Sequence, residues 1–248
     1  YWVSELDGGQ ASNTDDWATI LYQYDRSAPG VTTSLNLTDL MGFGVQANGN
    51  NYANGLELGF PGGNIAFFIA ALNDGPYVYS PGPPLVSREY DIIENFPGGI
   101  DYYNDGTNER VWYSHTITNR NVGYEPVSNL GDYEGEVNAS PGTGRIPDLE
   151  LSGDGSVVFY LVDDGTTHEL WRAPTGTPGA IGSDGPDDST LLTAVGGVPS
   201  ELSVDSGNDL VYFSDTTGTI RMVFSDGFWY GDTTLVSLTN SDGQFDVR

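Results

Sequence analysis

The sequence of 248 residues contains no cysteine and no lysine, and it has only two histidines. Without cysteine the chain has no disulfide bonds, thiolate nucleophiles or cysteine-ligated zinc. Eight basic residues, all of them arginine, stand against 35 acidic ones and give a formal net charge of −27 at pH 7. Because such a charge repels phosphate backbones and anionic lipid surfaces, we expect no nucleic-acid or membrane-surface partner. Cations, neutral polymers and other proteins remain as expected partners.

Long hydrophobic runs and helical periodicity are also missing. The longest apolar run, residues 65–72, is far shorter than the ~18 residues that a membrane span requires. We therefore expect no membrane span. The chain begins without a methionine or a basic-apolar leader, so we expect a mature or excised segment.

What the sequence does contain is a succession of short runs rich in Val, Ile, Tyr, Phe and Trp, separated by clusters of Gly, Asp, Asn and Ser. This pattern predicts an all-β fold. Residues 149–174 align with residues 201–224 with only small gaps. Residues 56–80 and 100–127 repeat the same order of strand, Gly/Asp turn, aromatic strand, polar turn and strand. The chain is therefore built from internal repeats.

An aromatic pair marks the middle strand of each copy: Phe67-Phe68, Trp112-Tyr113, Phe159-Tyr160 and Tyr212-Phe213. From the second member of the first pair to those of the next three, the successive steps are 45, 47 and 53 residues. Such a period is typical of four-stranded blades of a β-propeller, which take about 40–50 residues each. The outer strands are expected at residues 32–38, 189–195 and 233–239.

The two ends of the chain complete one further copy. Residues 241–248 resemble a first strand, and residues 1–6 and 19–30 resemble a second and a third strand. We therefore predict a single β-propeller domain over residues 1–248, with five four-stranded blades and a closing blade split between the N- and C-termini. Residues 41–55 form a Gly/Asn-rich insert, either a loop over one face or unrecognised strands. Six smaller blades are the alternative.

Three phrases carry a family resemblance: "IPDLELSGDGSVVFY" (146–160), "HELWRAPTG" (168–176) and "DLVYFSDTTGTIRMV" (209–223). They resemble blades of the TolB/PD40-like, NHL-like and YWTD-like propeller groups. The resemblance implies a scaffold that serves in other proteins as a binding platform, an assembly module, a lactonase, a phosphotriesterase or a glycosidase. The fold alone does not decide among these functions.

An acidic residue occupies the same position in four of the five predicted innermost strands: Glu57, Asp101, Glu150 and Asp246. The fifth strand has Ser203 there. In a closed propeller these side chains approach the central channel, where Ca²⁺, which takes six to eight oxygen ligands, would neutralise them. The alternative is that each acid is hydrogen-bonded to the backbone of a neighbouring blade. No cofactor other than Ca²⁺ is predicted.

The same acids define a hydrolase alternative. Five-bladed glycoside hydrolases resembling this architecture use central carboxylates as acid and base, which would give Glu57, Asp101 and Glu150 catalytic roles in a calcium-assisted glycoside hydrolase or lactonase. The sequence offers no cofactor loop and no Ser/His/Asp order in support. Asp-Gly turns such as residues 152–156 and 163–167 do not match a calcium-binding loop, so we expect hairpin turns there.

Two N-glycosylation sequons occur, at Asn36 and Asn138. They matter only in a secreted protein, and the acidity and absence of lysine favour an extracellular or cell-surface location. The leading hypothesis is a non-enzymatic propeller that binds a protein or glycan partner or assembles with copies of itself, as a glycosylated subunit of an extracellular fibre or array.

Overall fold

The structure is a computed structural model that describes residues 2–8, 17–24, 31–36, 53–63, 66–71, 75–81, 84–88, 99–107, 109–114, 121–129, 135–138, 144, 146–175, 189–215 and 220–226. Regular elements within these ranges are β-strands and two short 3-10 helices. No helix among them is long and apolar enough to cross a membrane.

In chain order the elements are β1 (Trp2–Gly8), β2 (Trp17–Tyr24), β3 (Val31–Asn36), β4 (Ala53–Gly59), η1 (Pro61–Gly63), β5 (Ala66–Ala71), β6 (Gly75–Pro81), β7 (Pro84–Arg88), β8 (Ile100–Asn104), β9 (Glu109–Ser114), β10 (Asn121–Pro126), η2 (Val127–Asn129), β11 (Gly135–Asn138), β12 (Leu149–Leu151), β13 (Val157–Asp163), β14 (His168–Pro174), β15 (Thr190–Ala194), β16 (Pro199–Asp205), β17 (Leu210–Asp215) and β18 (Ile220–Phe224).

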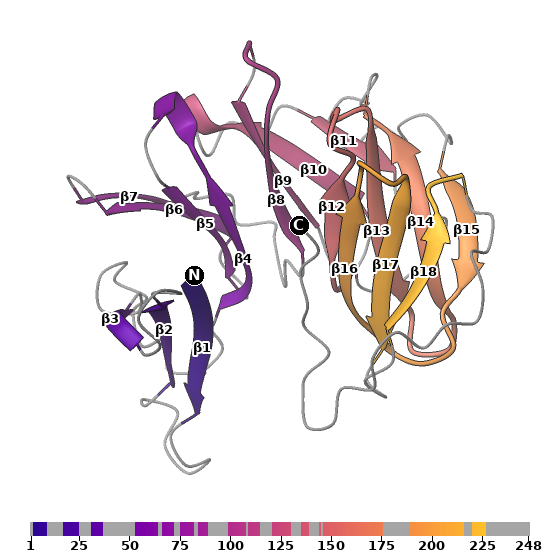
Figure 1. The fold of residues 1–248 in the computed structure, drawn as a ribbon, viewed down its shortest axis with the longest axis horizontal. Helices are drawn as coiled ribbons and strands as arrows, with labels where there is room; N and C mark the ends of the chain where they lie inside the picture. The colour runs from indigo at the N-terminus through magenta and orange to yellow at the C-terminus, as the bar shows by residue number, and fades with distance from the viewer. Residues whose placement is uncertain are drawn as a thin grey trace.

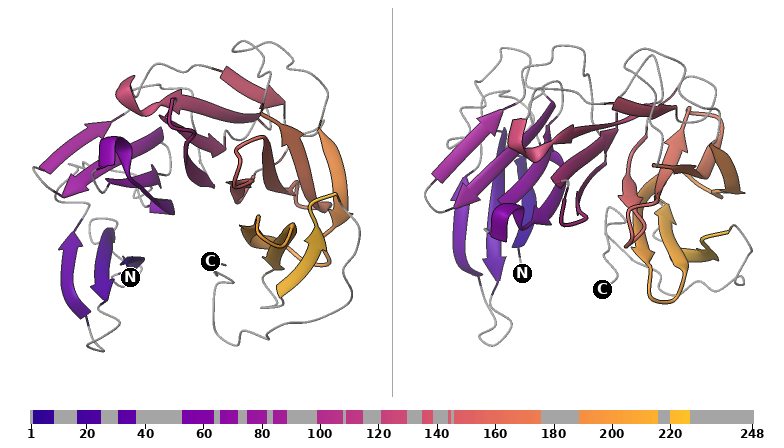
Figure 2. Two further views of the ribbon diagram at one scale, coloured as in Figure 1. Left: turned by 45° about the horizontal axis from the view of Figure 1, so that its top comes forward. Right: turned by 90° about the horizontal axis from the view of Figure 1, so that it is seen from above.

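The described strands form five antiparallel sheets: β1-β2-β3, β4-β5-β6-β7, β8-β9-β10-β11, β12-β13-β14-β15 and β16-β17-β18. Within each sheet every strand pairs with the strand that precedes it in the chain. The sheets follow one another in chain order around an arc (Figure 2). The first strands β4, β8, β12 and β16 contact one another in that order (Figure 1). The predicted all-β fold with repeated antiparallel units is confirmed.

The four aromatic pairs lie on the second strands of their sheets, β5, β9, β13 and β17, as predicted. The outer strands expected at residues 32–38 and 189–195 are present as β3 and β15. Those expected at residues 233–239 and 241–248 lie outside the described residues. Of the insert at 41–55, the last three residues belong to β4, and residues 41–52 are not described.

Two outer strands, β7 and β11, were not predicted from the sequence. β7 begins at Pro84 after a Pro-Gly-Pro run, and β11 is a strand of only four residues that begins at Gly135. Proline and glycine normally interrupt strands, but proline is tolerated at the first residue of an outermost strand because no partner there requires its N–H. Both strands were therefore missed because their first residues are of types that usually interrupt a strand.

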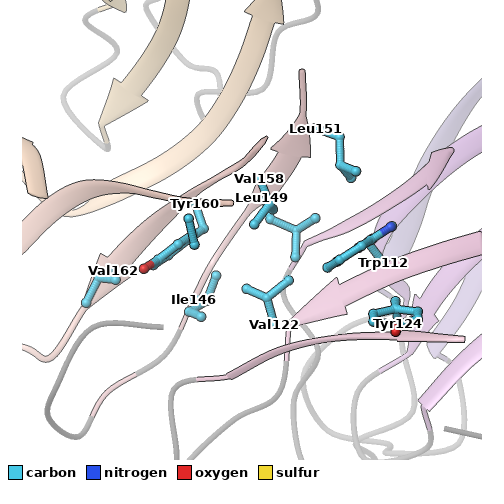
Figure 3. Close-up of a cluster of buried hydrophobic side chains, with 10 residues drawn as sticks. Trp112, Val122, Tyr124, Ile146, Leu149, Leu151, Val158, Tyr160 and Val162 are labelled. Carbon is cyan, nitrogen blue, oxygen red and sulfur yellow. The ribbon is translucent and has the colours of Figure 1, made fainter. Parts of the chain in front are cut away.

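Consecutive residues of the second strands β9 and β13 are buried because these two sheets are covered on both faces. Neighbouring side chains of a strand point to opposite faces of its sheet. On β13, Tyr160 packs with Trp112 of β9 and Leu149 of β12 in one cluster, as Figure 3 shows. The preceding residue, Phe159, packs with Phe213 of β17 in another cluster. One aromatic pair thus contributes to two separate cores.

The same division occurs on β9. Trp112 belongs to the cluster shared with β12 and β13, whereas Tyr113 packs with Ala66 of β5 and Ile100 of β8. Tyr113, Phe159 and Tyr160 are at most 1% exposed. Burying an aromatic side chain of this kind contributes roughly 1.5–3 kcal/mol. The aromatic pairs of β9 and β13 therefore supply apolar contacts between adjacent sheets.

Glycine permits the closest approach between two sheets. A Cβ at Gly99, directly before β8, would overlap the backbone of Asp148 and Leu149 at the start of β12. Gly99 is buried, and its N–H donates to Ser114 Oγ at 3.1 Å. Only glycine leaves room for two backbones at this separation.

We predict that Gly99→Ala lowers the free energy of unfolding by about 2 kcal/mol or more, because β8 and β12 must move apart to admit the methyl group. Chemical denaturation monitored by tryptophan fluorescence would measure the change. Gly207→Ala is the control, since Gly207 lies in an exposed turn where an added Cβ meets only Asp205 Oδ1, at 3.3 Å. Equal stability of the two variants would contradict the proposed close approach.

Candidate functional site

The acids predicted on the innermost strands lie on the first strands of three successive sheets. Glu57 is on β4, Asp101 on β8 and Glu150 on β12, and all three are half-buried. Ser203 on β16 is buried. The fourth predicted acid, Asp246, lies outside the described residues. The three described acids are therefore on strands that contact one another in sequence.

Two of these acids accept hydrogen bonds from the backbone of the following sheet. Asp101 Oδ2 accepts the N–H of Leu151 on β12 at 2.7 Å. Glu150 Oε2 accepts the N–H of Val204 on β16 at 3.0 Å. This is the inter-blade hydrogen bond that the sequence analysis gave as the alternative to calcium. Each carboxyl group therefore joins two adjacent first strands.

A further acid, Asp148, makes the same kind of contact and was not singled out from the sequence. Its Oδ2 accepts the N–H of Leu202 on β16 at 2.7 Å, and its Oδ1 accepts the N–H of Leu149 at 2.9 Å. Asp148 and Glu150 are two residues apart, and so are the two amides that they accept from β16. The sequence signal was the alternation Asp-Leu-Glu, which repeats an acid with the period of a strand.

The reason for missing Asp148 lies in the repeat itself. The corresponding residues are Gly55 on β4, Gly99 before β8 and Glu201 on β16, so an acid is not shared by every copy. Gly99 is the residue that packs against the backbone of Asp148 and Leu149. Gly99 and Asp148, which occupy the same repeat position in neighbouring sheets, therefore lie against each other where β8 meets β12.

Burial raises the pKa of all three hydrogen-bonded acids. It raises the pKa of Asp101 and that of Asp148 to about 7, although backbone hydrogen bonds act in the opposite direction. It raises the pKa of Glu150 to about 10, and the negative charges of Asp101, Asp148 and Glu57 add to the shift. The four carboxyl groups therefore interact, and the cluster retains protons near neutral pH.

A protonated carboxyl beside ionisable ones is an arrangement that general acids use. The hydrolase alternative with Glu57, Asp101 and Glu150 as catalytic residues stays a prediction. For calcium, no group of three or more His, Cys, Asp or Glu side chains in the described ranges is arranged to hold a metal ion. With Asp246 not described, the predicted calcium site also stays a prediction.

The Asp-Gly turns are hairpin turns closed by their own side chains. Asp154 Oδ1 accepts the hydroxyl of Ser152 at 2.7 Å and the N–H and hydroxyl of Ser156 at 3.0 and 2.7 Å, and these bonds lower the pKa of Asp154 to about 2. Asp164 Oδ1 accepts the N–H groups of Thr166 and Thr167 at 2.7 and 2.5 Å. These carboxylates stabilise the turns between strands, as the sequence predicted.

The predicted sequons lie on outer strands. Asn36 is the last residue of β3, and Asn138 is the last residue of β11. Both strands are outermost in their sheets as described.

Comparison with known proteins supports the fold. No protein-family model matches the chain, and no curated protein matches it. Among solved structures, a chain of the crystal structure of a nidogen/laminin complex matches with a TM-score of 0.63 and 8% sequence identity, over 90% of this chain and 73% of that chain. At this identity the similarity shows an all-β, propeller-like fold and nothing more.

The raised pKa values predict that stability falls as pH rises. Below about pH 4 these acids are protonated in both the folded and the unfolded chain, so their contribution is fully present. Between about pH 4 and 7 the unfolded chain releases protons that Asp101 and Asp148 retain in the fold, and the free energy of unfolding decreases. For Glu150 the decrease continues towards about pH 10. Asp148→Asn keeps a hydrogen-bond acceptor without the charge and should flatten this dependence.

We expect Asp148→Asn to stabilise the fold at about pH 8, by on the order of 1 kcal/mol, and to change it little at about pH 4. Denaturation at a series of pH values would measure this. Asp148→Ala, which also removes the acceptor, should destabilise at both. Asp226→Asn, at an exposed position, controls for the loss of one charge from a strongly acidic chain. A pH profile of Asp148→Asn that parallels the wild type would refute the assignment.

Proposed function

We propose that the chain is a non-enzymatic β-propeller that acts outside the cell as a binding or assembly module. The observation that carries this proposal is the use of the inner-strand carboxyl groups. Asp101, Asp148 and Glu150 each accept a backbone N–H from the next sheet, so they connect the first strands. Because these carboxyl groups hold adjacent sheets together, we assign them a structural role and expect the loops and sheet edges to bind a partner.

The proposed propeller is a single domain over residues 1–248 with five blades. Five sheets are present among the described residues, and each contacts the next in chain order. β1 runs in the opposite direction to β4 (Figure 1), as a second strand does relative to a first. It also contacts β4, just as the second strand β5 contacts the first strand β8. These features indicate that β1 is the second strand of its sheet, and they predict a first strand beside it.

Residues 245–248 are the proposed partner of β1. Their sequence Phe-Asp-Val-Arg places Asp246 where the other first strands carry Glu57, Asp101 and Glu150. The closing sheet would then contain strands from both ends of the chain, which stabilises a circular array because separating the ends breaks a complete sheet.

An extracellular location and a macromolecular partner are part of the proposal. The net charge of −27 and the absence of lysine favour a calcium-bearing or salty medium, because short carboxylates hold water and cations. The nidogen/laminin structure is a complex between proteins, which agrees with a protein-binding role for a propeller-like fold. The proposed partners are a second copy of the chain, another surface protein or a glycan.

Closure by residues 245–248 predicts a specific disulfide in a chain that has no cysteine of its own. Asp101 pairs with Trp112, the first residue of its aromatic pair. If Asp246 lies opposite Tyr1 in the same way, Gln244 lies opposite Val3. Val3→Cys combined with Gln244→Cys should therefore form an intramolecular disulfide on mild oxidation.

Non-reducing electrophoresis and peptide mapping would detect this bond. Val3→Cys combined with Ser34→Cys is the matched control, because β2 separates these two positions and two strand spacings, about 10 Å, exceed the reach of a disulfide. A disulfide between two chains would show that the strand pairs with a neighbouring subunit. No disulfide of either kind would reject the closing blade.

The proposed assembly role predicts oligomers or fibres that grow with protein concentration. Sedimentation velocity and electron microscopy of the purified chain, with and without added calcium, would measure them. Calcium should favour assembly by screening the repulsion between acidic subunits. A strictly monomeric species at high concentration in both conditions would exclude self-assembly and leave binding to another protein or a glycan to be tested by affinity capture.

A further inference from the structure

The turn that follows β4 exposes an aromatic side chain. Phe60 is 54% exposed, and among the described residues only Leu191, at 45%, is a comparably exposed large apolar side chain. Gly63 N–H donates to the carbonyl of Phe60 at 3.0 Å, and Gly62 and Gly63 have positive φ angles of 56° and 81°. Glycine adopts such angles at little cost, so the turn closes tightly beside Phe60. Phe60 is therefore presented to solvent by a closed turn.

Polar side chains of the next sheet lie beside this turn. Glu109 Oε1, at the start of β9, accepts the N–H of Gly62 at 2.9 Å. It also accepts Asn104 Nδ2 at 2.8 Å, and the same Nδ2 donates to the Tyr102 hydroxyl oxygen at 3.2 Å. Burial raises the pKa of Tyr102, and a backbone hydrogen bond with Phe60 acts in the opposite direction. These five residues form a group, the Phe60 site, where the second and third sheets meet.

The carboxylate of Glu109 is only half used by the fold. Both hydrogen bonds go to Oε1, and within the described ranges none reaches Oε2. The next residue, Arg110, points to the opposite face of β9, where its guanidinium lies over the ring of Tyr124, 4.7 Å from the centroid. The Phe60 site therefore combines an exposed aromatic ring with a carboxylate that the adjacent arginine does not neutralise.

We propose that the Phe60 site docks an arginine side chain of a basic partner protein. This inference rests on the proposed function and deepens it, because it names the kind of partner. A guanidinium group stacks on aromatic faces, and its paired N–H groups match a carboxylate. Phe60 and Glu109 offer these two contacts next to each other.

The charge of the chain favours this partner over the other two kinds. A net charge of −27 attracts a basic protein and accelerates its association. A second copy of the chain carries the same charge and is repelled. A neutral glycan gains nothing from the carboxylate charge of Glu109. The site therefore fits a positively charged protein best.

The Phe60 site is also held in place before a partner arrives. Hydrogen bonds continue from its turn to the corresponding turns of the following sheets. They join Gly62 N–H to Glu109 Oε1, Tyr103 O–H to Asp154 O (2.5 Å) and Gly153 N–H to Ser206 Oγ (2.6 Å). A surface that is already ordered loses little conformational entropy on binding. Its affinity for a partner therefore depends on the contacts themselves.

Fluorescence anisotropy tests the proposal on the full chain, with a labelled peptide in which arginine alternates with serine. The measurement is made at about 0.15 M salt, where charges farther apart than ~8 Å are largely screened. Phe60→Ala and Glu109→Gln should each weaken binding about threefold to fivefold, as expected for one exposed stacking or charged contact. Glu109→Gln keeps an oxygen for the N–H of Gly62, and circular dichroism would verify that both variants are folded.

Matched controls separate the Phe60 site from the general acidity of the chain. Leu191→Ala removes the other exposed large apolar side chain, and Asp226→Asn removes one negative charge at an exposed position after β18. Both variants should bind the peptide like the wild type. A citrulline peptide, which has the shape of the arginine peptide without its charge, should not bind detectably. A lysine peptide should bind more weakly, because an ammonium group lacks the planar paired donors.

Equal losses for Phe60→Ala and Leu191→Ala, or equal affinities for the arginine and lysine peptides, would overturn the proposal, since binding would then follow net charge alone. Binding of a neutral chito-oligosaccharide that is lost in Phe60→Ala would reassign the site to a glycan. Self-association that is lost in Phe60→Ala, measured by sedimentation velocity, would reassign it to a second copy. Each of these results leaves the closing disulfide as a separate test of the proposed propeller.

Discussion

Burial of sheets on both faces is the constraint from which the other features of this structure follow. A sheet placed between two neighbours has no solvent-facing side, so its second strand must present apolar side chains at successive positions. β13 satisfies this with an uninterrupted buried run from Val158 to Asp163. The aromatic pairs of β9 and β13 are the strongest form of this requirement, because the two members of each pair enter different cores. The five described sheets contact one another in chain order.

The same arrangement creates a polar requirement where the first strands meet. Adjacent first strands belong to different sheets, so their backbone N–H groups cannot all be satisfied by a ladder, and a buried amide without an acceptor costs about 1–3 kcal/mol. Asp101, Asp148 and Glu150 provide acceptors for Leu151, Leu202 and Val204 respectively. Burial removes water from these carboxyl groups and thereby raises their pKa values. The stability of the contact between adjacent first strands therefore depends on whether the carboxyl groups are protonated.

Prediction from the sequence succeeded where a feature recurred in every copy. The second strands were recognised because their aromatic pairs repeat, and the acids of β8 and β12 were recognised because Asp101 and Glu150 occupy matching positions. β7 and β11 were missed because Pro84 and Gly135 resemble strand breakers, although an outermost strand tolerates them. Asp148 was missed because its counterparts on β4 and before β8 are glycines, Gly55 and Gly99, and only a three-dimensional view shows that Asp148 and Gly99 pack together.

The sequence by itself determined the all-β character, the repeating unit and the positions of the paired aromatics, because these depend on local periodicity and composition. The tertiary structure decided which sheet packs against each face and which backbone N–H each carboxyl group accepts. Whether Glu150 faces a metal ion, a substrate or the N–H of Val204 depends on how a strand more than fifty residues away is placed beside it. No local pattern contains that information, because the relevant distance is set by the packing of one sheet against the next.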